Sequence, residues 1–190
     1  MFIKPMVFFY SIDTIRENVM KSPSSIEKIK EHQTHAITLI DKPQKYLLAT
    51  DNYYVAKDIN TNTFYMCLKN LLMVDIDFQK TKKGLSTLRE WCDTHKEYLF
   101  KVYSTQQGFH CFCISHKFEY TDDTVLNLML ELGSDLYYTV FVSLRGWCVR
   151  LNHKKIEYFV NSSLKVCTPV AFFIETIGYG TPLKEQEDIL

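Results

Sequence analysis

The chain has 190 residues, and its 22 Lys and Arg residues balance 22 Asp and Glu residues, so the formal net charge is zero. This length is enough for one domain with a substantial hydrophobic core, which needs neither disulfide bonds nor structural zinc to fold. The balanced charge excludes a strong overall field that would attract nucleic acid, so any basic surface must be local.

The first part of the chain predicts a helical flank followed by strands. The apolar start, residues 1–10, is too short to span a bilayer and is interrupted by Lys4 and Pro5. Residues 11–20 and 22–33 carry helix-start signals, so we expect residues 1–35 to form a helical N-terminal flank. Apolar and polar residues then alternate as in a β-meander, over residues 34–40, 45–50, 52–58, 63–68 and 71–78.

The second part of the chain predicts helices and strands in alternation. Apolar residues at helical spacing predict a helix over 85–95 and another from 122 or 123 to 132, where Gly133 ends it. Residues 137–144 fit either a strand or a helix. The remaining predicted strands are 98–105, 108–115, 147–152, 156–160 and 165–177. We therefore expect a single α+β domain over residues 1–190, with a mostly antiparallel sheet flanked by helices.

The segment LLMVDIDF, residues 71–78, contains two acids in an otherwise apolar strand. Side chains two residues apart on a strand point to the same face, so Asp75 and Asp77 project together. Two neighbouring carboxylates repel each other unless a cation lies between them, and oxygen ligands suit Mg²⁺ or Mn²⁺. The pair therefore predicts a metal site, with a turn cap and a solvated strand end as the alternative.

A second group of polar residues lies in STQQGFHCF, residues 104–112. The turn that ends at Gly108 delivers His110 onto the next strand, on the face opposite to Phe109. Hydroxyls such as that of Ser104, exposed backbone N–H groups and the imidazole suit phosphate oxygens. The alternative for His110 is a hydrogen-bonded histidine in the core.

The third group is basic and follows an acid. Arg145, Arg150 and Lys154 lie within residues 143–155, and an Arg between two apolar strand residues is costly unless it faces an anion. Arg150 is therefore either a phosphate ligand or part of a structural ion pair. Upstream, Asp135 is either a third metal-binding acid or a helix cap.

In this order, the acidic strand, the Gly-x-His strand and the later acid with its basic segment resemble the archaeo-eukaryotic primase superfamily. The similarity is strongest to the primase-polymerase branch and to primase-like proteins of large DNA viruses. The first motif is formed by residues 74–77, the second by residues 104–110, and the third by Asp135 with the basic residues after it. The matched stretch covers less than half of the chain. Glu157 or Glu175 could supply the third acid in place of Asp135.

The resemblance implies a primase-polymerase catalytic core with an RRM-like sheet. It implies template-directed nucleotidyl transfer, in which Asp75, Asp77 and Asp135 hold two divalent ions, Mg²⁺ or Mn²⁺. Five residues would bind the nucleotide: Ser104, His110, Arg145, Arg150 and Lys154. The implied partners are nucleoside triphosphates, a single-stranded DNA template that is bound weakly by the chain alone, and a helicase or other replication protein.

Two further classes of function remain open. Clustered carboxylates with a histidine also suit a metal-dependent nuclease or other phosphodiesterase. A primase-like domain without catalytic activity, which binds nucleic acid in replication, is the third hypothesis. The six cysteines lie in apolar runs without a C-x-x-C pair, so we expect buried thiols in a cytoplasmic or nuclear protein, with no membrane partner and possible viral origin.

Overall fold

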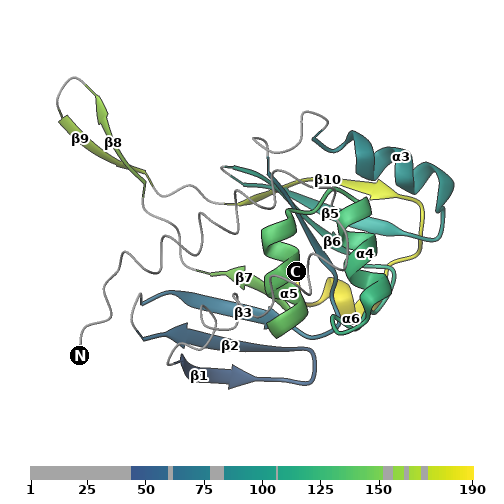
Figure 1. The fold of residues 1–190 in the computed structure, drawn as a ribbon, viewed down its shortest axis with the longest axis horizontal. Helices are drawn as coiled ribbons and strands as arrows, with labels where there is room; N and C mark the ends of the chain where they lie inside the picture. The colour runs from purple at the N-terminus through teal and green to yellow at the C-terminus, as the bar shows by residue number, and fades with distance from the viewer. Residues whose placement is uncertain are drawn as a thin grey trace.

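The computed structural model describes residues 44–59, 62–77, 84–105, 107–151, 156–160, 163–167 and 171–190 (Figure 1). Over these residues the fold is α+β, and the strands pair antiparallel throughout. The expected helical flank, residues 1–35, and the expected strand over 34–40 lie outside the described residues.

The first sheet has the strand order β1-β2-β3-β7. Its members are β1 (Gln44–Ala49), β2 (Tyr53–Asp58), β3 (Phe64–Leu68) and β7 (Trp147–Arg150). The first three strands form the predicted meander. Strand β7 comes from much later in the chain than β3. Its pairing with β3 therefore brings together the two ends of the segment between them, which carries the acidic pair, His110 and Asp135.

The second sheet has the strand order β10-β5-β6-β4. It contains β4 (Met73–Asp77), β5 (Leu99–Ser104), β6 (Gly108–Cys113) and β10 (Phe172–Gly178). The predicted strand over 165–177 is divided between β10 and β9 (Ser163–Cys167), and β9 pairs with β8 (Ile156–Val160) in a separate hairpin. Strand β4, which carries the acidic pair, is therefore at one edge of the second sheet.

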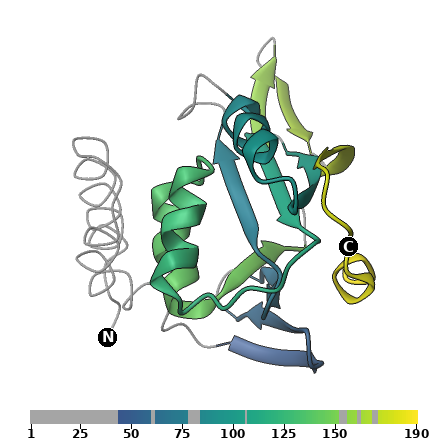
Figure 2. The same ribbon diagram turned by 90° about the vertical axis from the view of Figure 1, so that its right-hand side faces the viewer.

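Four described helices accompany the sheets: α3 (Ser86–Thr94), α4 (Asp123–Glu131), α5 (Leu136–Arg145) and α6 (Lys184–Glu187). Helix α3 packs against β10, and α5 packs against α4 and β7; Figure 2 shows α4 and α5 side by side. The ambiguous segment 137–144 is helical. Its buried residues Leu136, Thr139 and Val140 follow helical spacing, and Asp135 caps its first turn.

A single hydrophobic cluster includes residues from both sheets and from the helices. Leu68 of β3, Trp147 of β7, Val74 of β4 and Met129 of α4 are all at most 2% exposed. Trp147 is therefore a core residue. Because β4 is packed into this shared core, the acidic pair is held in a fixed place relative to both sheets.

Within the described part of the chain, none of the helices has the length and apolar character needed to cross a membrane.

Candidate functional site

The acidic strand and the histidine strand are direct neighbours. In the antiparallel pairing of β4 with β6, Asp75 lies opposite His110, and Asp77 lies opposite Gly108. Residues directly opposite each other point to the same face, and His110 Nε2 is 3.6 Å from Asp75 Oδ1. The pairing of β4 with β6 thus brings two acids and one imidazole to one face, although Asp75 and His110 are 35 positions apart in the sequence.

The imidazole of His110 is neutral near pH 7. Its side chain is 26% exposed, and burial lowers its pKa from 6.5 to about 4. At 3.6 Å the contact with Asp75 is longer than a hydrogen bond, and a neutral ring forms no ion pair with the carboxylate. His110 therefore offers an N–H donor beside the acids without adding a positive charge.

Gly108 allows β4 and β6 to approach each other. A Cβ added at this position would lie 1.7 Å from the backbone oxygen of Ile76, so no other residue fits without moving β4. The turn before it is closed by two hydrogen bonds: Thr105 N–H donates to the Gly108 carbonyl (2.8 Å), and Gly108 N–H donates to Thr105 Oγ1 (3.0 Å). These two N–H groups, which the sequence suggested for phosphate binding, stabilise the turn itself.

The outer edge of β4 is covered by the loop that enters α5. Asp135 N–H donates to the carbonyl of Asp75 (2.7 Å), and Asp75 N–H donates to Ser134 Oγ (3.3 Å). Since both backbone groups of Asp75 bond to this loop, Asp75 and His110 form a non-hydrogen-bonded pair, the kind in which opposite side chains lie closest. Sequence reasoning missed Ser134, although a Ser next to a candidate acid is the signal that points to it.

The backbone N–H of Asp135 is hydrogen-bonded to Asp75, whereas the carboxylate of Asp135 has a structural role. It accepts a hydrogen bond from Tyr138 N–H (2.8 Å) and so caps α5, which is the alternative that the sequence left open. In the described part of the chain, no three His, Cys, Asp or Glu side chains are grouped so that they could hold a metal ion by themselves.

The other two candidates for a third acid lie elsewhere. Glu175 is opposite Val102, which is opposite Cys111, so the register places it on the face away from Asp75 and His110. There its carboxylate pairs with Arg89 at 2.5 Å. Glu157 belongs to β8, and its side chain is outside what the structure describes.

The expected phosphate ligands are separated. Ser104 is opposite Phe109, so it projects from the face away from His110. Arg150, at the end of β7, is exposed, so it is not buried with its apolar neighbours. Arg145 ends α5 with its guanidinium carbon 5.1 Å from the Phe141 ring centre and 5.8 Å from that of Tyr65. Lys154 lies outside the described residues.

Aromatic side chains continue the face that carries His110. Tyr103 of β5 lies opposite His110, and Phe173 of β10 lies opposite Tyr103. The rings of Tyr103 and Phe173 are 5.8 Å apart, and Phe173 is 51% exposed. The pairing of β5 with β10 brings these two rings together, and this pairing of an edge strand is not visible in the sequence.

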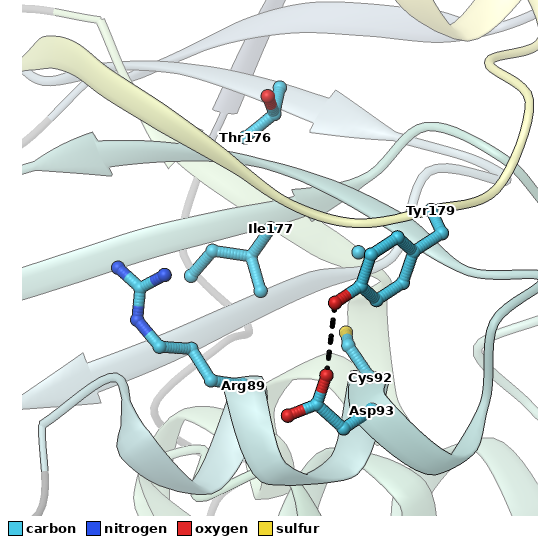
Figure 3. A pocket seen from close by; sticks show the side chains of 7 residues that line it. Arg89, Cys92, Asp93, Thr176, Ile177 and Tyr179 are labelled. Carbon is cyan, nitrogen blue, oxygen red and sulfur yellow. Dashed lines mark hydrogen bonds between the residues drawn. The ribbon is translucent and has the colours of Figure 1, made fainter.

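A pocket with a volume of about 320 Å³ lies between α3 and β10 (Figure 3). There the Tyr179 hydroxyl donates to the Asp93 carboxylate at 3.1 Å, and Arg89 lines the wall. Because this wall is the α3 side of β10, which also carries Glu175, the pocket is separate from the face of Asp75 and His110. We therefore take the sheet face with the acids as the candidate site.

The chain has no significant match to any protein-family model, to any curated protein or to any solved structure.

Proposed function

We propose that this chain is a template-directed nucleotidyltransferase, the catalytic core of a DNA primase or polymerase with an RRM-like sheet. The observation that carries the proposal is the convergence of Asp75, Asp77 and His110 on one sheet face. Carboxylates beside a hydrogen-bond donor are what a metal-bound triphosphate requires. The resemblance of these motifs, in the same order, to the primase-polymerase branch gives the reaction class.

The two acids fit a metal that arrives with its nucleotide. Mg²⁺ is usually bound by one or two protein carboxylates, with substrate phosphates and water as its other ligands. Asp75 and Asp77 meet that requirement without a third protein ligand. When bound, Mg²⁺ or Mn²⁺ would stabilise the charge on the phosphates and favour ionisation of the attacking hydroxyl.

The remaining residues of the face orient the substrates. The neutral imidazole of His110 donates a hydrogen bond to a phosphate oxygen, and an arriving phosphate favours the protonated ring. Tyr103 and the exposed Phe173 offer ring faces on which bases of a single-stranded template stack. The loop at Ser134 holds the backbone of Asp75 and thereby keeps its carboxylate beside His110.

One observation favours a second candidate function. The carboxylate of Asp135 is engaged as a helix cap, so the face offers a two-carboxylate site instead of a three-carboxylate one. A site of that kind could bind a metal–nucleotide complex without transferring the nucleotide to a growing strand. The second candidate is therefore a primase-like module that binds nucleotide or nucleic acid in a replication complex.

Incorporation of nucleotides on a primed single-stranded template, with Mn²⁺ or Mg²⁺, tests the first proposal. We expect incorporation by the natural chain, its loss in D75N and D77N, and its retention in the matched control E175Q, whose acid lies on the other face. Equal incorporation by all four proteins would refute the site. Cleavage of the strand without added nucleotides would indicate a phosphodiesterase. Metal-dependent nucleotide binding without incorporation would indicate the binding module.

A further inference from the structure

Cys67 and Cys148 form a thiol pair between β3 and β7 of the first sheet, whereas the proposed catalytic face belongs to the second sheet. They lie directly opposite each other on β3 and β7, their sulfur atoms are 2.8 Å apart, and the residues are 5% and 9% exposed. Opposite residues of antiparallel strands have Cα atoms about 4.5–5.5 Å apart. This separation is within the range of about 4.4–6.8 Å that a disulfide needs, so the backbone need not move for a bond to form.

The surroundings of the pair favour a thiolate on one of its two sulfurs. Hydrogen bonding from Cys148, and then from Tyr54, together with the nearby guanidinium of Arg145, lowers the pKa of Cys67 from 9.0 to about 7 against the opposing effect of burial. Burial raises the pKa of Cys92, Cys111 and Cys113. Only thiolates react readily with peroxides, so Cys67 differs in reactivity from these three thiols.

Arg145 gives this arrangement a clear physical basis. Its Nε atom is buried and has no hydrogen-bond partner within the described residues. A negative charge on the Cys67 sulfur compensates the guanidinium, which also lies near the rings of Tyr65 and Phe141. The basic residue that the sequence assigned to phosphate is thus placed to activate a thiol.

We propose that Cys67 and Cys148 are a redox-active pair, which a hydroperoxide oxidises to a disulfide between β3 and β7. The Cys67 thiolate attacks one peroxide oxygen and breaks the O–O bond, giving a sulfenic acid at Cys67 and a hydroxide that takes up a proton. The Cys148 sulfur then attacks the Cys67 sulfur and the S–O bond breaks. The hydroxyl leaves as water with the Cys148 proton. Overall, two thiols and hydrogen peroxide give one disulfide and two waters, and a dithiol reductant reverses the change.

The disulfide would close a long segment of chain. The two cysteines are 81 positions apart, and Asp75, His110 and Asp135 all lie between them. Closing a loop of this length restricts the unfolded chain and stabilises the folded one. The redox state of Cys67 and Cys148 therefore affects the stability of the segment that holds the acidic face, whether or not that face transfers nucleotides.

The experiment treats the full chain with a small excess of hydrogen peroxide and analyses it by intact mass and non-reducing peptide mapping. We expect a loss of about 2 Da, a peptide pair joined through Cys67 and Cys148, and reversal by dithiothreitol. The melting temperature should rise by about 5–15 °C on oxidation. The variants C67A and C148A should both lose the linked peptide pair and this rise, and the control C92A should keep them.

Several outcomes would overturn the proposal. They are peroxide treatment that leaves both cysteines reduced, that joins either of them to another cysteine, or that carries Cys67 to sulfinic acid without a link to Cys148. The peptide map of the unmodified sequence decides among these outcomes even if a variant fails to fold. None of them bears on nucleotide incorporation, so the redox pair and the proposed function fail independently.

Discussion

The depressed pKa of His110 predicts a loss of stability in mildly acidic solution. In the unfolded chain the imidazole has its ordinary pKa of 6.5, whereas burial in the folded chain lowers it to about 4. Below about pH 6.5 the unfolded chain therefore binds more protons at this residue than the folded chain does. The stability associated with neutral His110 is complete above pH 6.5 and is lost as the pH falls toward 4.

The size of this loss follows from the two pKa values. At about 1.4 kcal/mol for each factor of ten in proton affinity, the full difference is about 3 kcal/mol in the free energy of unfolding. Between pH 7 and pH 5, about 2 kcal/mol of it should be lost. The variant H110Q cannot take up this proton, so its free energy of unfolding should fall by about 2 kcal/mol less over the same range.

Urea denaturation of the two proteins at pH 7, 6 and 5 measures the difference, and NMR titration of the imidazole gives the pKa of His110 directly. The two proteins differ at position 110 alone, so contributions that do not depend on His110 cancel in the comparison. Parallel pH dependence of the two proteins, or titration of His110 at or above 6.5, would show that burial of a neutral His110 does not cause the loss. The latter result would mean that the charge of Asp75 outweighs burial.

Substitutions at three positions of the face, Gly108, Ser134 and Asp135, test how it is built, and G133A serves as a control. G108A should cost about 3 kcal/mol or more in urea denaturation because the new Cβ meets the backbone of Ile76, whereas G133A, at φ +88° with open space around it, should cost only about 1–2 kcal/mol; equal costs would remove the steric argument. S134A should cost about 1 kcal/mol and weaken binding of Mn²⁺ with nucleotide, because the backbone of Asp75 loses its acceptor; unchanged binding would mean that Ser134 does not position Asp75. D135A should cost about 1 kcal/mol as a lost helix cap, and D135N should be close to the natural chain in stability and metal affinity; a large loss of metal affinity in D135N would make Asp135 a ligand.

Much of the fold could be predicted from the sequence because its strands carry strong local signals. The meander over 45–68 and the acidic strand at 73–77 alternate or concentrate apolar residues as buried strands do. Helix α5 was ambiguous because its aromatic and β-branched residues are common in strands. Burial at helical spacing decides the matter, and it depends on tertiary packing; the cap at Asp135 is a local contact that agrees with it.

The candidate site was less accessible to sequence reasoning, since it depends on register. Asp75 and His110 share a face because β4 and β6 are neighbours in one particular register, which the close approach at Gly108 permits. The alternation of side chains along one strand does not show on which face Ser104 lies relative to His110, because a turn separates their two strands. The apolar neighbours of Arg150 suggested an inward position, but the residue ends an edge strand and points to solvent.

A crystal structure of the chain with Mn²⁺ and a non-hydrolysable nucleoside triphosphate would show whether the acidic pair binds a metal together with a nucleotide. We expect an anomalous-scattering peak for manganese between the carboxylates of Asp75 and Asp77, with a phosphate oxygen within hydrogen-bond distance of His110 Nε2. Manganese and triphosphate bound elsewhere, such as in the pocket between α3 and β10, with the acidic pair bare, would contradict this expectation.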